Sequence, residues 1–147
     1  MTTRFTNFLV FLYRWECVRD RKGNVISENV AGDPGGLTKY GIDRASHKDT
    51  DIEHLTEPQA REIYWQEWTA TGSESVADKL GECYFNACVN CGGSRARKLL
   101  ATSRNAAGFI DNQEAFYRAL AAKRADLRQF LKGWLNRTGD LRKFVGV

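Results

Sequence analysis

The carboxyl group of Glu16 occupies an unusual position for a charged side chain. On a helical wheel, with about 100° between successive residues, it falls between Leu9 and Leu12, inside the apolar stripe of the first predicted helix. Desolvation disfavours the charged form of a carboxyl group, so a glutamic acid in such a place is suited to keep its proton near neutral pH and act as a general acid. The alternative is a helix-end ion pair with a nearby arginine, Arg14, Arg19 or Arg21, and position alone favours that ordinary role.

Polar side chains also gather in the glycine-rich stretch GDPGGLTKYG, residues 32–41. Pro34 fixes its own φ, and the glycines that follow it can adopt positive φ, so the backbone can reverse sharply there. The turn would place Asp33 and Thr38 together. Facing Glu16 across a cleft, they would supply a carboxylate and a hydroxyl that hold a water molecule or stabilise positive charge on a sugar. The alternative is an Asx turn that only caps the segment after it.

The elements that must position these groups are mainly helical. Apolar residues at helical spacing predict a first helix over residues 3–15. Short alternating residues around Gly23 predict a small β-hairpin over residues 17–30, expected to be the only sheet. Thr56 and Gln59 form a capping box, which predicts that the next helix begins there. The expected fold class is therefore mainly α, with one small β-hairpin.

The second half of the sequence predicts further helices. An apolar stripe from Val76 to Cys91, ended by two glycines, predicts a buried central helix. Ser94 is expected to cap a short helix, and Asp111 to begin a long one that extends through Leu131. The best candidate for a seam is the segment 103–108.

Length and charge limit the classes of function. A chain of 147 residues with 42% hydrophobic content can bury one core, which predicts a single domain. Its net charge of +4 favours anionic partners: nucleic acid, a membrane surface or an acidic cell-wall polymer. The apolar run 5–12 is shorter than the ~20 residues that span a bilayer, and Arg14 and Glu16 follow it without a cleavage site. We therefore expect synthesis in the cytoplasm without a signal peptide, and no stable membrane insertion.

Four blocks occur in one order along the chain: Glu16 near the end of the first helix, DPGGLTKYGI (33–42), FNACVNCG (85–92) and KGWLNR (132–137). In this the sequence closely resembles the glycoside hydrolase family 108 muramidases, lysozyme-like proteins of phages and prophages. The resemblance implies a lysozyme-like helical domain that cleaves the β-1,4 bond between N-acetylmuramic acid and N-acetylglucosamine in bacterial peptidoglycan.

The resemblance also implies roles for residues. Glu16 stands at the family's catalytic glutamate, and Asp33 and Thr38 at the supporting positions of a Glu-Asp-Thr arrangement. One domain, 1–147, would combine a catalytic part (1–106) with a peptidoglycan-binding-like helical part (107–147) packed on it. The chemistry needs no metal or cofactor. We expect a monomer, an endolysin that reaches the wall through a holin or secretion machinery.

The chain departs from the family pattern at three places. Cys17 and Val18 stand where the family has glycines, Asn86 where an aspartate is expected, and Cys91 where a serine is expected. None of these changes alters Glu16. We therefore expect them to affect the rate of hydrolysis more than its existence.

Three further residues are candidates for binding substrate. Asn86 and Asn90 are four residues apart and share a helix face, so their amides could bond acetamido groups or sugar hydroxyls. The alternative for each is a buried, hydrogen-bonded amide, more so for Asn86. Tyr40 offers a flat ring on which a sugar can pack, although aromatic side chains in small helical proteins are more often part of the core.

The cysteines do not indicate a metal site. Cys83, Cys88 and Cys91 have no histidine near them, whereas structural zinc usually has four ligands. Their helical spacing instead favours packing as small apolar side chains. Cys17, beside the proposed acid, is the one that could react.

Two other classes of function compete with the muramidase. The first is a non-catalytic peptidoglycan-binding or secretion-assisting protein, a label carried by some relatives of the family. The second is nucleic-acid binding, indicated only by net charge and by the basic run 95–98. No nucleic-acid module is visible, and a basic helix face is the simpler interpretation of that run, so no nucleic-acid partner is expected.

Overall fold

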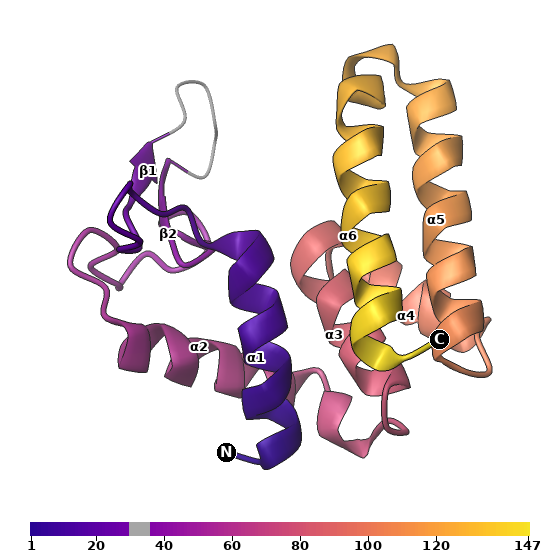
Figure 1. Cartoon of the computed structure of the whole chain (residues 1–147), viewed down its shortest axis with the longest axis horizontal. Helices are drawn as coiled ribbons and strands as arrows, with labels where there is room; N and C mark the ends of the chain where they lie inside the picture. The colour runs from indigo at the N-terminus through magenta and orange to yellow at the C-terminus, as the bar shows by residue number, and fades with distance from the viewer. Residues whose placement is uncertain (30–35) are drawn as a thin grey trace. The chain divides into compact units, whose positions relative to one another are not determined.

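Residues 1–29 and 36–147 are described by the computed structural model, and the chain divides into two units, Met1–Glu67 and Trp68–Val147 (Figure 1). The boundary falls within one helix, α2 (Glu57–Ala70). The division expected after residue 106 lies inside the second unit. The mainly helical, lysozyme-like fold class with a small antiparallel sheet is confirmed.

Helix α1 (Thr3–Glu16) follows the prediction for 3–15 closely. It begins where the Thr2 side chain accepts a hydrogen bond from the Phe5 amide at 3.2 Å, which satisfies one of the free amides of the first turn. Its apolar stripe is buried: Phe5, Phe8, Leu9, Phe11 and Leu12. It ends because Cys17 adopts an extended conformation, while the Cys17 amide still donates to the Tyr13 carbonyl at 3.0 Å.

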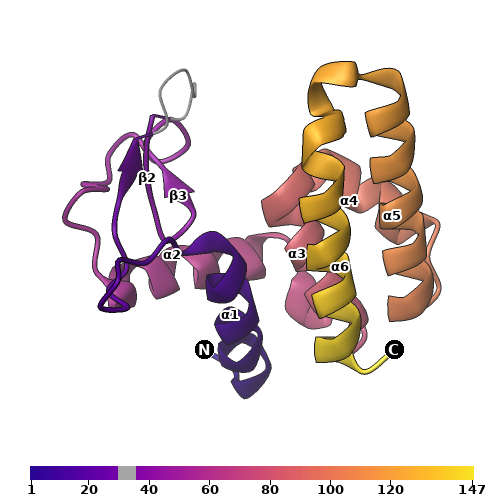
Figure 2. The ribbon, with the colours of Figure 1, turned by 45° about the horizontal axis from the view of Figure 1, so that its top comes forward.

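Three short strands form an antiparallel sheet in the order β1 (Glu28–Asn29), β2 (Leu37–Lys39) and β3 (Ile42–Asp43). Figure 2 shows β2 and β3 side by side. The expectation that a hairpin over 17–30 would be the only sheet was wrong. Around Gly23 only an isolated bridge forms, between Arg19 and Val25, and the tighter turn at Tyr40-Gly41 organises the sheet instead.

Helix α2 begins as the capping box predicts. The Gln59 side-chain oxygen accepts hydrogen bonds from the Thr56 amide and hydroxyl, each at 2.9 Å. The helix packs against α1 through the Phe5 and Trp65 rings, whose centroids are 5.1 Å apart. The N-terminal unit is thus built from two crossed helices and the small sheet (Figures 1 and 2).

The second unit is helical among its described residues. It contains α3 (Leu80–Cys91), α4 (Gly93–Ala101), α5 (Ala106–Lys123) and α6 (Leu131–Val145), with short 3-10 turns η1 (Ser73–Ser75) and η2 (Ala125–Phe130). Helices α5 and α6 lie side by side in both views (Figures 1 and 2). Among the described residues, none of the helices combines the length and hydrophobicity that crossing a bilayer requires.

Two helix boundaries in this unit differ from the prediction. Helix α3 begins at Leu80 rather than Val76, because the residue before it, Lys79, has a φ of +67° that no α-helix accommodates. Helix α5 begins five residues before Asp111, where the Asn105 side chain accepts from the Gly108 amide at 2.9 Å. The long helix predicted through Leu131 is interrupted at an extended residue after Lys123, and α6 was not predicted.

Candidate active site

Glu16 is the last residue of α1, and its side chain is partly buried. The group that it packs against is the backbone of Gly41. A Cβ atom placed on Gly41 would lie 2.6 Å from Glu16 Cβ and 2.9 Å from Glu16 Oε2. The proposed acid therefore lies in direct contact with Gly41, the last residue of the glycine-rich stretch. The expected arrangement, with Asp33 and Thr38 facing Glu16 across a cleft, stays a prediction.

The contact depends on an unusual turn. Tyr40 and Gly41 join β2 to β3 as a two-residue hairpin turn, with φ of +56° and +79°. Positive φ at both central residues matches the right-handed twist of the strands but is costly for a residue with a side chain. Tyr40 is held there because its carbonyl accepts a hydrogen bond from Tyr64 Oη at 2.8 Å. Gly41 leaves room for Glu16.

Aromatic side chains surround the turn. The Tyr13 ring lies 5.6 Å from the Tyr40 ring and 6.1 Å from the Tyr64 ring. Burial raises the pKa of Tyr64 well above its ordinary value, and the charge of Glu16 adds to the effect. Tyr64 therefore keeps its proton and remains a hydrogen-bond donor. The Tyr13 hydroxyl is buried and has no hydrogen-bond partner among the described residues.

Cys17 follows Glu16 directly. Burial raises the pKa of its thiol to about 11, the Arg19 charge opposes this rise, and the Glu16 charge adds to it. The thiolate is the reactive form of cysteine. At neutral pH Cys17 is therefore a thiol, which disfavours the reactivity that its position led us to consider.

Thr38 belongs to the same hairpin as Gly41. In the register of the sheet it lies between Glu28 on β1 and Asp43 on β3, and residues paired in this way project from the same face. Burial raises the pKa of Asp43, but hydrogen bonds from Ser46 and the charge of His47 outweigh it, so the net shift is downward. Asp43 thus remains a carboxylate beside Thr38.

Asp33, the carboxylate expected to accompany Thr38, lies outside the described residues. The structure adds Gly41, Tyr64 and Asp43 to the neighbourhood of the site, none of which the sequence singled out. For Gly41 the signal was its place in the glycine-rich stretch. Tyr64 falls in the apolar stripe of α2, where nothing distinguishes it from a core residue.

The two asparagines on α3 bond to other residues of the second unit. Asn86 is completely buried, and its oxygen accepts a hydrogen bond from Arg137 Nε at 2.9 Å. This is the buried amide that was the alternative to a substrate contact. Asn90 is partly exposed and donates to Tyr117 Oη, which also accepts from Gln113 Nε2 at 2.8 Å. A substrate-binding role for either amide stays a prediction.

The four cysteines form no disulfide. Burial raises the pKa of the Cys83 thiol to about 12, in keeping with a cysteine that packs as an apolar side chain. In the part of the chain that the structure describes, no group of three or more histidine, cysteine, aspartate or glutamate side chains is arranged to hold a metal ion.

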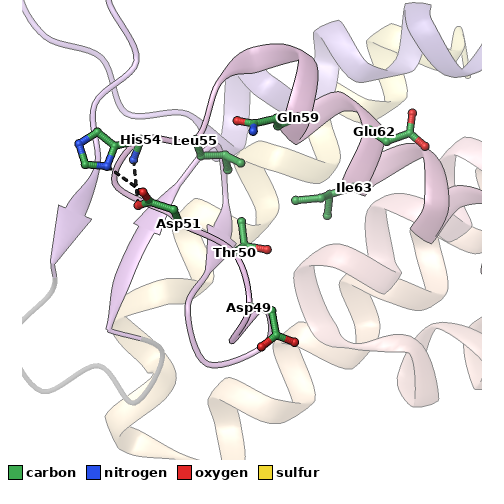
Figure 3. Close-up of a pocket in the computed structure, with 8 residues that line it drawn as sticks. All are labelled: Asp49, Thr50, Asp51, His54, Leu55, Gln59, Glu62 and Ile63. Atoms are coloured by element: carbon green, nitrogen blue, oxygen red, sulfur yellow. Dashed lines mark hydrogen bonds and ion pairs between the residues drawn. The ribbon is translucent and has the colours of Figure 1, made fainter.

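A hollow of about 420 Å³ opens elsewhere in the N-terminal unit, between the segment 49–55 and α2 (Figure 3). Its apolar surface comes from Leu55 and Ile63, and acidic side chains lie around it. Asp51 is already bonded to His54, with 2.9 Å between Oδ2 and Nδ1. The lining includes neither Glu16 nor the Tyr40-Gly41 turn, so Glu16 and this turn lie outside the hollow.

The family model described as glycosyl hydrolase 108 matches residues 18–92, just over half of the chain. The chain belongs to the glycosyl hydrolase 108 family. The matched span contains Thr38, Gly41, Tyr64 and both asparagines of α3, and Glu16 stands two residues before it. Membership supports a glycoside hydrolase with a lysozyme-like function on peptidoglycan.

A solved structure, "Structure of Brucella abortus SagA", is similar to this glycosyl hydrolase 108 protein, with a TM-score of 0.72 and 18% identity. The match covers 96% of this chain and 92% of that chain. At this identity the likeness shows the fold alone. No curated protein matches the sequence.

Proposed function

We propose that this glycosyl hydrolase 108 protein is an N-acetylmuramidase that cleaves the β-1,4 bond between N-acetylmuramic acid and N-acetylglucosamine in bacterial peptidoglycan. The observation that carries the proposal is the packing of Glu16 on Gly41. This packing supports the view that the carboxyl group is held in one position at the end of a rigid helix. Catalysis requires a reacting group to be fixed in this way.

In the proposed reaction Glu16 donates its proton to the glycosidic oxygen as the bond breaks. Positive charge then develops on the sugar ring, and a carboxylate stabilises it. We propose Asp33 for this role, with the Thr38 hydroxyl positioning the attacking water. Asp43, ionised beside Thr38, adds negative charge to the same hairpin. The protonated Tyr64 holds the Tyr40 carbonyl and keeps the turn in place.

Binding to the wall would draw on the second unit. Phe130 is 50% exposed, and its ring lies 6.1 Å from the ring of the partly exposed Trp134, which stacks at 5.0 Å on the buried ring of Tyr117. Exposed aromatic faces are surfaces on which sugar rings pack. This supports the assignment of residues 107–147 as a wall-binding part. It also favours the second candidate, a non-catalytic peptidoglycan-binding or secretion-assisting protein.

The proposed biological setting is that of a phage or prophage endolysin. It would act on the cell wall after release through a holin-like pore or secretion machinery. The net charge of +4 favours attraction to an anionic wall.

Glu16→Gln tests the proposal, because the amide keeps the shape of the side chain and has no proton to donate. We expect it to abolish release of reducing sugars from purified peptidoglycan and to retain binding in a pull-down with the same material. Glu62→Gln, on the exposed side of α2, is the matched control and should behave as wild type. If the wild-type protein binds the wall and releases no sugars, the non-catalytic candidate is correct.

A further inference from the structure

The hairpin that carries Gly41 is attached to α2 at two points. The first is the hydrogen bond from Tyr64 Oη to the Tyr40 carbonyl. The second is an ion pair between His47 Nε2 and Glu67 Oε1, 3.4 Å apart. Tyr64 and Glu67 are three residues apart on α2, so their side chains project from the same side of the helix. One face of α2 therefore contacts both the Tyr40-Gly41 turn and the segment that follows β3.

The segment between the Tyr40-Gly41 turn and His47 is short. The strand β3 follows Gly41 directly, and a single compact turn then leads to His47. In that turn Asp43 Oδ1 accepts from the Ser46 amide at 2.8 Å, and the His47 amide donates to the Asp43 carbonyl at 3.2 Å. A displacement of the His47 ring is thus transmitted through a short, hydrogen-bonded segment to the residue on which Glu16 rests.

The attachment is titratable and partly buried. Burial raises the pKa of Glu67, while the charge of His47 and its hydrogen bond lower it and the charge of Asp43 raises it. The charge of His47 thus lowers the pKa of both Asp43 and Glu67, while the ion pair is made with Glu67. The His47 Nδ1 atom is buried and has no hydrogen-bond partner among the described residues. The Glu67 side chain is still 40% exposed, so its burial is partial. Carboxyl groups whose pKa is raised in this way cluster at functional sites.

The pair is also close enough to influence the site by its charge. The groups facing Glu67 are His47 and Asp43 from the hairpin side, and Tyr64 from its own helix. Tyr64 is influenced by Glu16 and by Glu67 together. It therefore links the proposed acid to the ion pair, both through space and through the turn that it bonds.

We propose that the His47–Glu67 pair is a positioning element for Glu16, which fixes the hairpin bearing Gly41 and makes that position depend on pH. His47 and Glu67 are positioning residues and do not touch the substrate. The effect on hydrolysis rests on the proposed function, whereas the effect on the hairpin does not. The two are tested separately.

The structural test is an NMR titration of the full chain that follows the Gly41 amide and the His47 ring. In the wild type the Gly41 resonance should shift with the same midpoint as the His47 ring. The shift should disappear in Glu67→Gln and His47→Gln, and persist in Glu62→Gln, the matched exposed position on the same helix. A Gly41 amide that does not follow His47, or that follows it equally in Glu67→Gln, overturns the proposal.

The kinetic test uses the same variants on purified peptidoglycan. Because a displacement of about 1 Å at a catalytic group costs up to ~100-fold, Glu67→Gln should lower kcat by roughly 10- to 100-fold. The pH profile of Glu67→Gln should lose one limb while wall binding is retained. The double variant His47→Gln with Glu67→Gln should have a kcat no lower than that of either single variant. Wild-type kcat and pH profile in Glu67→Gln overturn the kinetic claim. If the wild type hydrolyses nothing yet Gly41 still follows His47, the proposed function fails and the positioning role stands.

Discussion

Replacing Gly41 by alanine tests the geometry on which the site depends. The new Cβ would lie 2.6 Å from Glu16 Cβ and 2.6 Å from Tyr64 Oη. Carbon atoms in contact are normally ~3.5–4.0 Å apart, so one or both neighbours must move. If Tyr64 moves, its bond to the Tyr40 carbonyl is broken. If Glu16 moves, the proposed acid leaves its place.

Two costs combine in this variant. An alanine at a φ of +79° adopts a left-handed conformation, which destabilises the fold by roughly 1–2 kcal/mol. The overlap with two side chains adds the cost of overpacking, about 1–3 kcal/mol. We therefore expect Gly41→Ala to lower the free energy of unfolding by about 2–5 kcal/mol. Native domains typically have a free energy of unfolding of ~5–15 kcal/mol, so a variant of a domain in the upper part of this range stays folded.

Gly23→Ala is the matched control. Gly23 has a similar φ, +86°, lies in a turn of the same unit, and has nothing within 4 Å of an added Cβ. Gly23→Ala should lower the free energy of unfolding only by the backbone contribution, roughly 1–2 kcal/mol. Urea denaturation of both variants gives the comparison, and release of reducing sugars gives the activity. Equal losses of stability in the two variants, or full activity of a folded Gly41→Ala protein, would refute the packing of Glu16 on Gly41.

Three further predictions concern single groups. Tyr64→Phe leaves the Tyr40 carbonyl without its donor and should lower the free energy of unfolding by about 1–3 kcal/mol, as read from urea denaturation; an unchanged midpoint would show that water replaces the hydroxyl. Because its pKa is about 11 rather than the reference 9.0, Cys17 should react with iodoacetamide at pH 8 roughly 100-fold more slowly than an ordinary thiol, and the rate should rise with pH up to about that pKa. Labelling at the ordinary rate would contradict this environment. Asn105→Ala removes the hydrogen bond to the Gly108 amide and should lower the free energy of unfolding by about 1 kcal/mol. Its thermal midpoint should fall, whereas that of Asn105→Asp should not.

Helix boundaries were predictable where a single local signal was present. The capping box at Thr56 and Gln59 marks the start of α2, and both bonds are found. At α5 the sequence analysis expected the helix to begin at Asp111, and the chain caps it with Asn105 instead. The reason is packing: Phe109 and Ile110 are completely buried, so the helix must extend far enough back to include them. A propensity scale does not contain that information.

The sheet was predicted in kind and misplaced in position. Its strands are only two or three residues long, too short for an alternation of polar and apolar residues to reveal them. Their pairing follows from the turn at Tyr40 and Gly41. That turn is stabilised by Tyr64, a residue 24 positions away in the chain.

By itself, the sequence determined that Glu16 stands at the end of the first helix and that a glycine-rich stretch with Thr38 follows it. The sharp reversal expected at residues 33–36 lies largely outside the described residues and stays a prediction. These properties are local, because helical periodicity and the conformational freedom of glycine act over a few residues. Only the tertiary structure decided that Glu16 rests on Gly41, that Tyr64 holds the turn, and that His47 pairs with Glu67. Such contacts join segments that the chain brings together only on folding, and no local pattern of residues encodes which backbone atom a carboxyl group will meet.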